Sequence, residues 1–261
     1  MFSFLLVLSL LFAGSEQLIT DFCKTSYCKP GVQNVGCNPP PIEGGPACEG
    51  KLASEANLTI YGQKIIVHQH NLLRSRLAKG ELKPFAAASR MPLLIWDDEL
   101  AVQASHNTRS CVLNHDECPN TAQFRFVGQN IDLFRYTYPS IEPPYLIVQR
   151  IYNWWREFNQ TTQAQLDNYP SITPTSPIEH FAQMINDRAW KIGCSIQRWF
   201  DAQFYNVFYF VCNYSFRNMP GQPVYTKGPP ASQCATGEHE VYPGLCSVRE
   251  YISSTPNAIT N

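Results

Sequence analysis

Residues 206–214 read NVFYFVCNY, and residues 190–198, a short distance before them, read WKIGCSIQR. Both stretches are rich in the aromatic and β-branched side chains that fit a pleated, half-buried surface. They are separated only by residues 199–205. This part of the chain therefore predicts an antiparallel hairpin.

Helical patterns lie upstream of the hairpin. Apolar residues recur at spacings near 3.6 over residues 61–79, which predicts an amphipathic helix. A second helix is expected over residues 99–113, with Asp97 or Asp98 as its cap. A third is expected over residues 144–158, where apolar residues recur in the same way.

A fourth helix has a strong start signal. Ser176 has the position of an N-cap, Pro177 takes the first turn, and Glu179 is spaced as the partner of a capping box. Shorter strands are expected over residues 93–96 and 127–134. Because helices cluster before the strands that close the sheet, the pattern favours an α+β fold over a doubly wound one.

The composition indicates a secreted protein. The chain has 261 residues, of which 44% are hydrophobic, so a large core can form. A formal net charge of -1 argues against nucleic acid or an anionic membrane as the main partner, because both attract surplus Lys and Arg. Residues 1–15 are predicted to be a signal peptide, since the apolar run over 4–12 is too short to span a bilayer. The alternative for this run is a short buried helix. No membrane span is expected elsewhere.

Sequons and cysteines support the same compartment. Glycans are expected on Asn57 and Asn159, whereas Asn213 directly follows Cys212 in an apolar run and is expected to carry none. The chain has 10 cysteines, an even number, which favours five disulfides over metal sites in a secreted chain. No Cys-x-x-Cys is present, which argues further against a zinc site of cysteines.

Four short segments occur in a recognisable order. In chain order they are Gly128-Gln129-Asn130, Trp154-Trp155-Arg156-Glu157, His180-Phe181-Ala182-Gln183-Met184 and Tyr209-Phe210-Val211-Cys212-Asn213-Tyr214. They resemble the signature segments of the CAP superfamily (SCP/TAPS), which includes cysteine-rich secretory proteins, antigen 5 and plant pathogenesis-related proteins. The four N-terminal cysteines, with Cys111 and Cys118 enclosing His115, narrow the resemblance to the insect antigen 5 branch. The resemblance covers residues 20–219.

The resemblance implies a three-layer α-β-α sandwich with a disulfide-rich N-terminal extension and a short C-terminal tail that carries a cysteine pair. It divides the chain into a signal peptide (1–15), an N-terminal extension (16–60), a CAP domain (61–219) and a C-terminal extension (220–261). The protein is expected to be a monomer. The disulfides that the resemblance implies are Cys23–Cys37, Cys28–Cys118, Cys48–Cys111 and Cys194–Cys212, with Cys234–Cys246 as the remaining pair.

CAP proteins line a cleft with two histidines and two acidic residues. The matching positions of this chain are His115, His180 and Glu157, while Gln129 replaces the second acid, a substitution frequent in insect antigen 5 proteins. An amide cannot serve as a general base or add negative charge. Two hypotheses stay open. The four side chains form a hydrogen-bonded structural cluster, or His115 and His180, with the one carboxylate of Glu157, hold a divalent zinc or copper ion whose shell water completes.

Other parts of the chain depart from the family pattern or carry other roles. Glu179 stands where the family usually has Gly, and Ile185-Asn186 stands where it usually has Val-Trp, so the rim of the cleft is expected to differ. His70 resembles a family position that buttresses the core. Residues 119–145 and 159–176 are expected to form contact loops, with an aromatic stretch over 134–139.

The resemblance implies a non-enzymatic protein that binds an extracellular protein or a small lipid ligand in a fluid such as saliva, venom or seminal fluid. No cofactor is required for such a role. One alternative is a metal-dependent enzyme with copper or zinc at His115 and His180. A purely structural extracellular protein is the other.

Overall fold

A computed structural model describes residues 20–56, 58–137, 143–171, 177–201, 203 and 205–253. The expected signal peptide, the sequon at Asn57 and the expected cap at Ser176 lie outside these residues. Within the described ranges, none of the helices has the length and apolar character needed to cross a bilayer.

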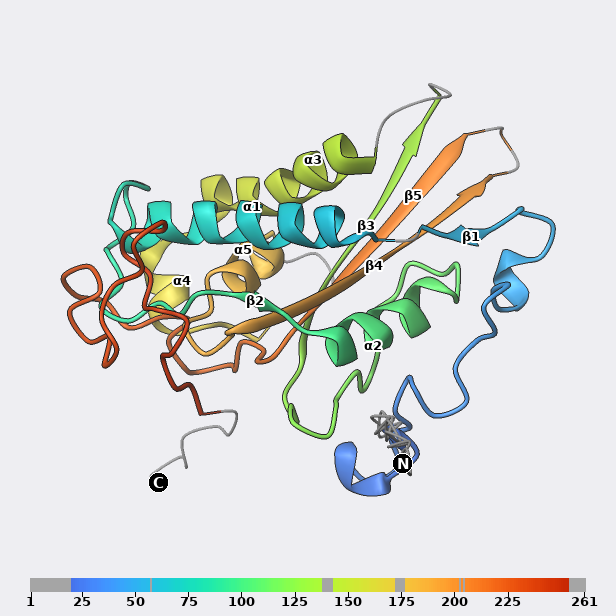
Figure 1. Cartoon of the computed structure of the whole chain (residues 1–261), viewed down its shortest axis with the longest axis horizontal. Coiled ribbons are helices and arrows are strands. Elements are labelled where there is room, and N and C mark those ends of the chain that lie inside the picture. The colour runs from blue at the N-terminus through green and yellow to red at the C-terminus, as the bar shows by residue number, and fades with distance from the viewer. Residues whose placement is uncertain are drawn as a thin grey trace, which may run out of the picture.

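The predicted hairpin is confirmed and forms the centre of the sheet. β4 (Lys191–Phe200) and β5 (Asn206–Tyr214) are antiparallel, and β3 (Gly128–Tyr136) pairs antiparallel with the other edge of β5. The outer edge of β4 carries two short strands, antiparallel β1 (Ser54–Glu55) and parallel β2 (Ile95–Trp96). The order is therefore β1-β4-β5-β3, with β2 also beside β4 (Figure 1).

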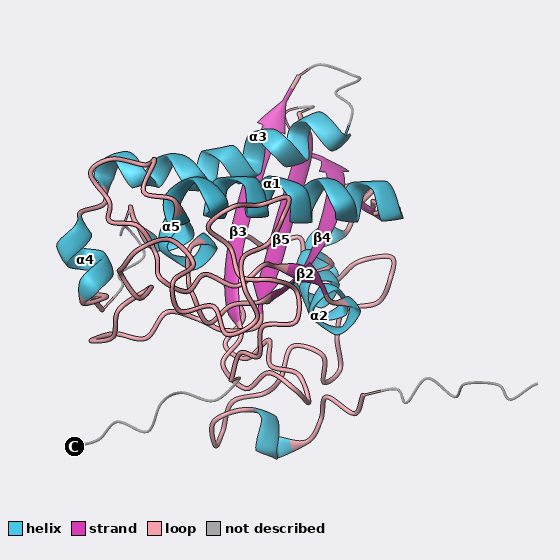
Figure 2. Ribbon diagram, turned by 60° about the vertical axis from the view of Figure 1, so that its left-hand side comes forward, coloured by secondary structure: helices cyan, strands magenta, loops and turns pink. Residues whose placement is uncertain are grey.

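Helices cover both faces of this sheet. α1 (Ile60–Ala78), α3 (Pro143–Trp155) and α5 (Glu179–Met184) lie on one face, and α2 (Asp98–Thr108) lies on the other (Figures 1 and 2). The architecture is the three-layer α-β-α sandwich that the resemblance implied.

α2 packs closely against β4 and ends earlier than predicted. Asp97 caps its first turn by accepting a hydrogen bond from the Leu100 N–H at 3.0 Å, as the sequence indicated. Gly193 of β4 permits the approach, because a Cβ at this position would collide with the α2 backbone. The helix ends at Thr108, and the prediction that it extends to residue 113 was wrong. Cys111 has a left-handed φ of 54°, which an α-helix does not accommodate.

The start predicted for α5 was also wrong. The helix begins at Glu179 after Ile178, whose side chain provides no cap. A capping box occurs instead at α4 (Gln163–Asp167), where Thr162 and Gln165 each accept from the backbone N–H of the other. This helix lies inside the segment 159–176, which was expected to be loop.

Two further boundaries differ from the sequence predictions. β3 continues to Tyr136, so the first part of the expected aromatic loop is strand, with the Phe134 and Tyr136 rings stacked 5.9 Å apart. After α3 the chain tightens into a 3-10 helix (Arg156–Gln160) instead of continuing as an α-helix to residue 158.

β1 was not predicted, because two residues are too few to show an alternating pattern.

The main core lies between the sheet and the helices α1, α3 and α5. Trp154 is almost fully buried and stacks on Phe210, with ring centroids 5.0 Å apart. Arg74 of α1 is also fully buried in this layer. Its guanidinium donates hydrogen bonds of 2.7–3.1 Å to the backbone carbonyls of Pro92, Met184, Asn186 and Ala189. Arg74 thereby joins α1 to the segments that flank β2 and follow α5.

Five disulfides are present, and two of them, Cys28–Cys118 and Cys48–Cys111, attach the N-terminal extension to the sandwich. The bonds are Cys23–Cys37, Cys28–Cys118, Cys48–Cys111, Cys194–Cys212 and Cys234–Cys246. They are the pairs that the family resemblance implied. The C-terminal extension also contacts α1, where the Tyr242 hydroxyl lies 2.8 Å from Nδ1 of His68.

Candidate functional site

Gln129 of β3 is the centre of the first half of the site. Its Oε1 accepts from the His115 ring at Nδ1 and from the Asp116 N–H, both at 3.1 Å. Its Nε2 donates to Asp116 Oδ2 at 2.6 Å and to Asn213 Oδ1 at 3.0 Å. All four hydrogen-bonding positions of the amide are therefore used, two as acceptor and two as donor. A carboxylate at this position could accept but could not donate.

Asp116 explains why an amide suits this position. Burial raises the pKa of Asp116 to about 6, although hydrogen bonds from Gln129 and from Asn107 oppose the rise. A second carboxylate beside Asp116 would repel it. Position 129, where the family has an acid on the strand, therefore has a carboxylate beside it in this protein, that of Asp116 on the loop that carries His115.

Glu157 is the centre of the second half of the site. Its Oε1 accepts from Nδ1 of His180 at 2.6 Å. Its Oε2 accepts from the backbone N–H groups of His180 at 2.8 Å and Phe181 at 3.0 Å, which are free donors of the first turn of α5. Glu157 therefore caps the first turn of α5 from outside the helix.

The surroundings shift the pKa values of the two histidines in opposite directions. Burial lowers the pKa of His180, but the hydrogen bond and charge of Glu157, with the charges of Glu179 and Asp132, outweigh burial and raise it above 6.5. Burial lowers the pKa of His115, and a charge on His180 lowers it further, against the opposing effects of Glu179 and Gln129. The neutral form of His115 is thus favoured relative to that of a free imidazole.

Both histidines lie beside the edge strand β3, and the charges of Glu179 and His180 of α5 act on the His115 ring. Consecutive residues of a strand point to opposite faces of a sheet. Gln129 bonds His115 and, through Asn213, the α2 side, whereas Asn130 donates to the His180 carbonyl at 3.2 Å on the side of α5. The structure therefore places the two rings within electrostatic range without joining them by a hydrogen bond.

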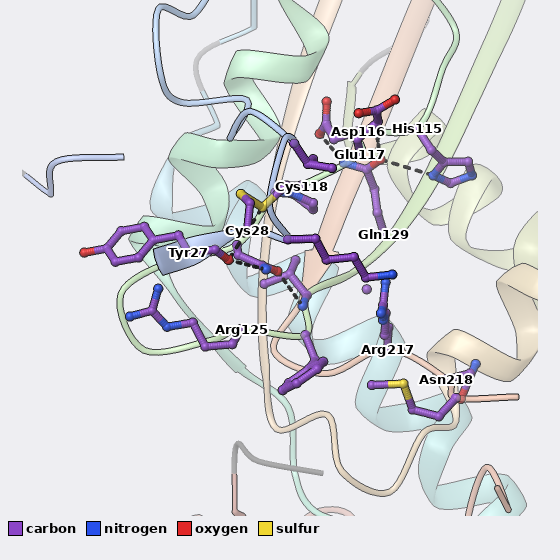
Figure 3. Close-up of a pocket in the computed structure, with 18 of the residues that line it drawn as sticks. Tyr27, Cys28, His115, Asp116, Glu117, Cys118, Arg125, Gln129, Arg217 and Asn218 are labelled. Carbon is purple, nitrogen blue, oxygen red and sulfur yellow. Dashed lines mark hydrogen bonds between the residues drawn. A yellow bond between two sulfur atoms is a disulfide. The ribbon is translucent and has the colours of Figure 1, made fainter. Parts of the chain in front are cut away.

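A groove of about 860 Å³ opens beside His115 (Figure 3). His115, Asp116, Gln129 and Glu179 line one part of it, and neither His180 nor Glu157 is in its lining. The other walls come from the N-terminal extension, the loop before β3 and the segment after β5. These walls include Tyr27, Lys29, Arg125, Phe126, Arg217, Asn218 and Met219.

The donor set does not fit a metal centre completed by protein side chains. Among the residues that the structure describes, no three His, Cys, Asp or Glu side chains are placed to hold an ion. Glu157 is committed to His180 and Phe181, and the amide of Gln129 has no free position. Of the four side chains expected in the cleft, only His115 and His180 can still offer a donor, their Nε2 atoms, whereas zinc sites use three or four protein ligands.

Two other histidines have structural roles. His70 is fully buried, and its Nδ1–H donates to the Ile66 carbonyl at 2.8 Å while Nε2 accepts from the Tyr214 hydroxyl at 2.9 Å. Burial lowers the pKa of His70 to about 4. His106 bonds Gln103 at 3.0 Å, a partner that the sequence did not indicate.

The two sequons within the described residues differ in exposure. Asn159 is exposed, so a glycan there stays a prediction. Asn213 is fully buried and donates to the Leu100 carbonyl at 3.3 Å, which leaves no room for a glycan.

Sequence reasoning missed three groups that shape the site. Asp116 follows His115 directly, which is the one signal that could have identified it. Lys29 and Arg217 line the groove from segments far apart in the chain, and no pattern in the sequence connects them.

Comparisons with known proteins agree with this architecture. The profile of the CAP family, described as the cysteine-rich secretory protein family, matches residues 67–214. "Venom allergen-1" of Aedes albopictus is 38% identical, with 96% of this chain and 95% of that protein covered. "Antigen 5 like allergen Cul n 1" of Culicoides nubeculosus is 32% identical, over 69% of this chain and 84% of that protein.

A solved structure shares the fold. The structure titled "Crystal structure of NaASP2 with Zn2+" superposes with a TM-score of 0.60 and is 25% identical, over 72% of this chain and 96% of that one. The sandwich, the signature segments and the sequence relatives lead to the same assignment. The chain belongs to the CAP superfamily, the cysteine-rich secretory protein family, and is antigen 5-like.

Proposed function

We propose that this protein is secreted and non-enzymatic, and that the groove beside His115 holds an extracellular ligand. The groove itself is the observation that supports the proposal. Its volume of about 860 Å³ lies in the range of small-molecule sites, about 300–1,000 Å³. The Cys28–Cys118 disulfide lies in its wall and fixes the N-terminal extension beside the loop of His115. Because the disulfide already fixes this wall, little conformational entropy is lost when a ligand binds.

The committed hydrogen bonds support binding over catalysis. General-base catalysis needs a group that can take a proton from the substrate. Gln129 cannot take one, and the Glu157 carboxylate is occupied by His180 and the first turn of α5. His115 lines the groove, but its Nδ1 is bonded to the amide of Gln129. A histidine that activates a nucleophile is usually oriented by a third group such as a carboxylate, and an amide does not supply that charge.

The ligand is an extracellular protein or a small lipid. The names of the sequence relatives, venom allergen and antigen 5-like allergen, place those proteins in secreted fluids. Secretion of this chain follows as part of the proposal.

The test is to recover the protein from the fluid into which it is secreted and to identify what it carries by native mass spectrometry. Wild type should retain one ligand in stoichiometric amount. Val32→Trp, which adds bulk to the groove wall, should lose that ligand while keeping the thermal unfolding of wild type. Equal retention by both proteins would place the ligand elsewhere, and a ligand-free wild type would contradict the proposal.

Metal-dependent catalysis is the rival function that this site must be tested against. The relative NaASP2 was crystallised with Zn2+. We propose that this protein requires no metal, because the described part of the chain places no three His, Cys, Asp or Glu side chains around one ion.

A further inference from the structure

The groove beside His115 has its charged side chains separated by sign. Three carboxylates line it: Asp116 and Glu117 follow His115 directly in the chain, and the charge of Glu179 acts on the His115 ring. Its cations come from the other walls. Figure 3 shows Asp116 and Glu117 above Gln129, and Arg125 and Arg217 on the opposite side of it. The ends of the groove therefore differ in electrostatic character.

Three cations reach this groove from different parts of the chain: Lys29 of the N-terminal extension, Arg125 before β3 and Arg217 after β5. Across the described residues, none of the ion pairs closer than 4.0 Å involves any of the three. None of the three charges is therefore neutralised by a direct ion pair, and an anion bound beside them would supply a partner of opposite sign.

The segments that carry these cations are fixed to the fold. Lys29 follows Cys28, whose disulfide with Cys118 joins it to the groove wall. The Arg217 N–H donates to the Phe126 carbonyl at 2.7 Å, which fixes the segment after β5 beside the loop before β3. The Arg125 guanidinium lies 4.0 Å from the centre of the Tyr27 ring and is oriented by it. Lys29 and Arg217 are exposed and free to meet a ligand.

Apolar side chains lie among the cations. Phe126, Val127, Tyr169 and Met219 all line the groove, and Val127 and Tyr169 are buried beneath it. A site with an apolar surface and a few convergent charges binds ligands that have an apolar body and a complementary charged group.

We propose that this groove binds a small amphiphilic anion, with its carboxylate, sulfate or phosphate at Lys29 and Arg217 and its apolar body along Phe126 and Met219. The inference rests on the proposed function and names the class of ligand for the same groove. The carboxylates at the His115 end orient the ligand, because they repel its charged group toward Arg217. A long polyanion is disfavoured for the same reason.

The experiment uses two fluorescent probes of the same shape, the aromatic sulfonate 8-anilinonaphthalene-1-sulfonate and the neutral N-phenyl-1-naphthylamine. Wild type should bind the sulfonate more tightly than the neutral probe, and less tightly as salt is added. Arg217→Gln and Lys29→Gln should each weaken sulfonate binding by about tenfold, the effect of one charge-assisted hydrogen bond. Neither substitution should change binding of the neutral probe.

Matched controls are available on the exposed surface. Arg198→Gln and Lys64→Gln remove the same charges from β4 and α1, outside the lining of this groove, and should leave sulfonate binding within about twofold of wild type. Displacement of the sulfonate by dodecanoate or by 1-naphthyl sulfate distinguishes an alkyl from an aromatic ligand. Displacement by neutral dodecanol to the same extent would overturn the proposal.

Sulfonate binding that is equal in wild type, Arg217→Gln and Lys29→Gln would also overturn it. That result would leave the proposed function standing if Val32→Trp still lost the native ligand. Loss of sulfonate binding in the two groove variants, together with an unchanged native ligand in Val32→Trp, would instead support the anion site and contradict the proposed place of the native ligand.

Discussion

The Glu157 carboxylate accepts a hydrogen bond from the His180 ring at 2.6 Å and also caps the helix that carries His180. One side chain therefore sets both the protonation of the ring and the position of α5. The pairing of Glu157 with His180 therefore also stabilises the core, because α5 packs against α3 and the Phe181 ring packs against Trp155.

Replacement of Glu157 by Gln should lower the pKa of His180 and destabilise the fold. The pKa of His180 is raised in the folded protein, so the pair contributes stability that is fully present below about pH 6.5 and is lost as the pH rises through the raised value. We expect a loss of about 1.5–3 kcal/mol between pH 5 and 6.5 and a smaller loss above it. NMR titration of His180 and urea unfolding at several pH values measure both effects.

Glu179→Gln is the matched control for this prediction. Glu179 also raises the pKa of His180 through its charge, but it makes no hydrogen bond to the ring. Its replacement should change the unfolding free energy less than Glu157→Gln does. Equal losses in the two variants would show that charge, and not the cap and the hydrogen bond, is the source of the stability.

Restoring the family acid with Gln129→Glu should destabilise this protein. The new carboxylate would face Asp116 and Asn213 with acceptors where the amide has donors. The pKa of Asp116 should rise above about 6, so the loss, about 1–3 kcal/mol, should be present near neutral pH and diminish as the pH falls through the raised value.

Gln129→Met separates the charge effect from loss of the hydrogen bonds. It removes the same bonds without adding a charge, so its destabilisation should change much less between pH 5 and 8. Thermal unfolding across this range compares the variants. A Gln129→Glu protein as stable as wild type near neutral pH would mean that Asp116 does not restrict this position.

Arg74 should be required for stability. Arg74→Met leaves four backbone carbonyls without their donor, and each buried unpaired group costs about 1–3 kcal/mol. We expect a loss of at least about 3 kcal/mol in urea unfolding followed by tryptophan fluorescence, with Arg74→Lys between this variant and wild type. A loss below about 1 kcal/mol in Arg74→Met would show that water replaces the guanidinium.

Metal titration decides between the binding and the enzymatic functions. Isothermal titration of zinc and copper should give binding weaker than micromolar in wild type and none in His115→Ala/His180→Ala, because the described residues place no three His, Cys, Asp or Glu side chains around one ion. Binding should weaken as the pH falls through about 6.5, since the ligand is the neutral ring. Submicromolar copper binding with turnover of superoxide, both lost in the double variant, would refute the binding-protein proposal.

Local sequence patterns predicted the hairpin, the helices and the cap at Asp97, because hydrophobic periodicity and capping involve residues close together in the chain. The sequence also carried the signature segments of the CAP family, through which the resemblance implied the three-layer sandwich. It did not reveal that Glu157 caps α5, that Gln129 uses all its hydrogen bonds, or that Lys29 and Arg217 share a groove. Each of these depends on side chains from segments far apart in the chain. The distances between these side chains are set only when the sheet, the helices and the disulfides have fixed the positions of those segments.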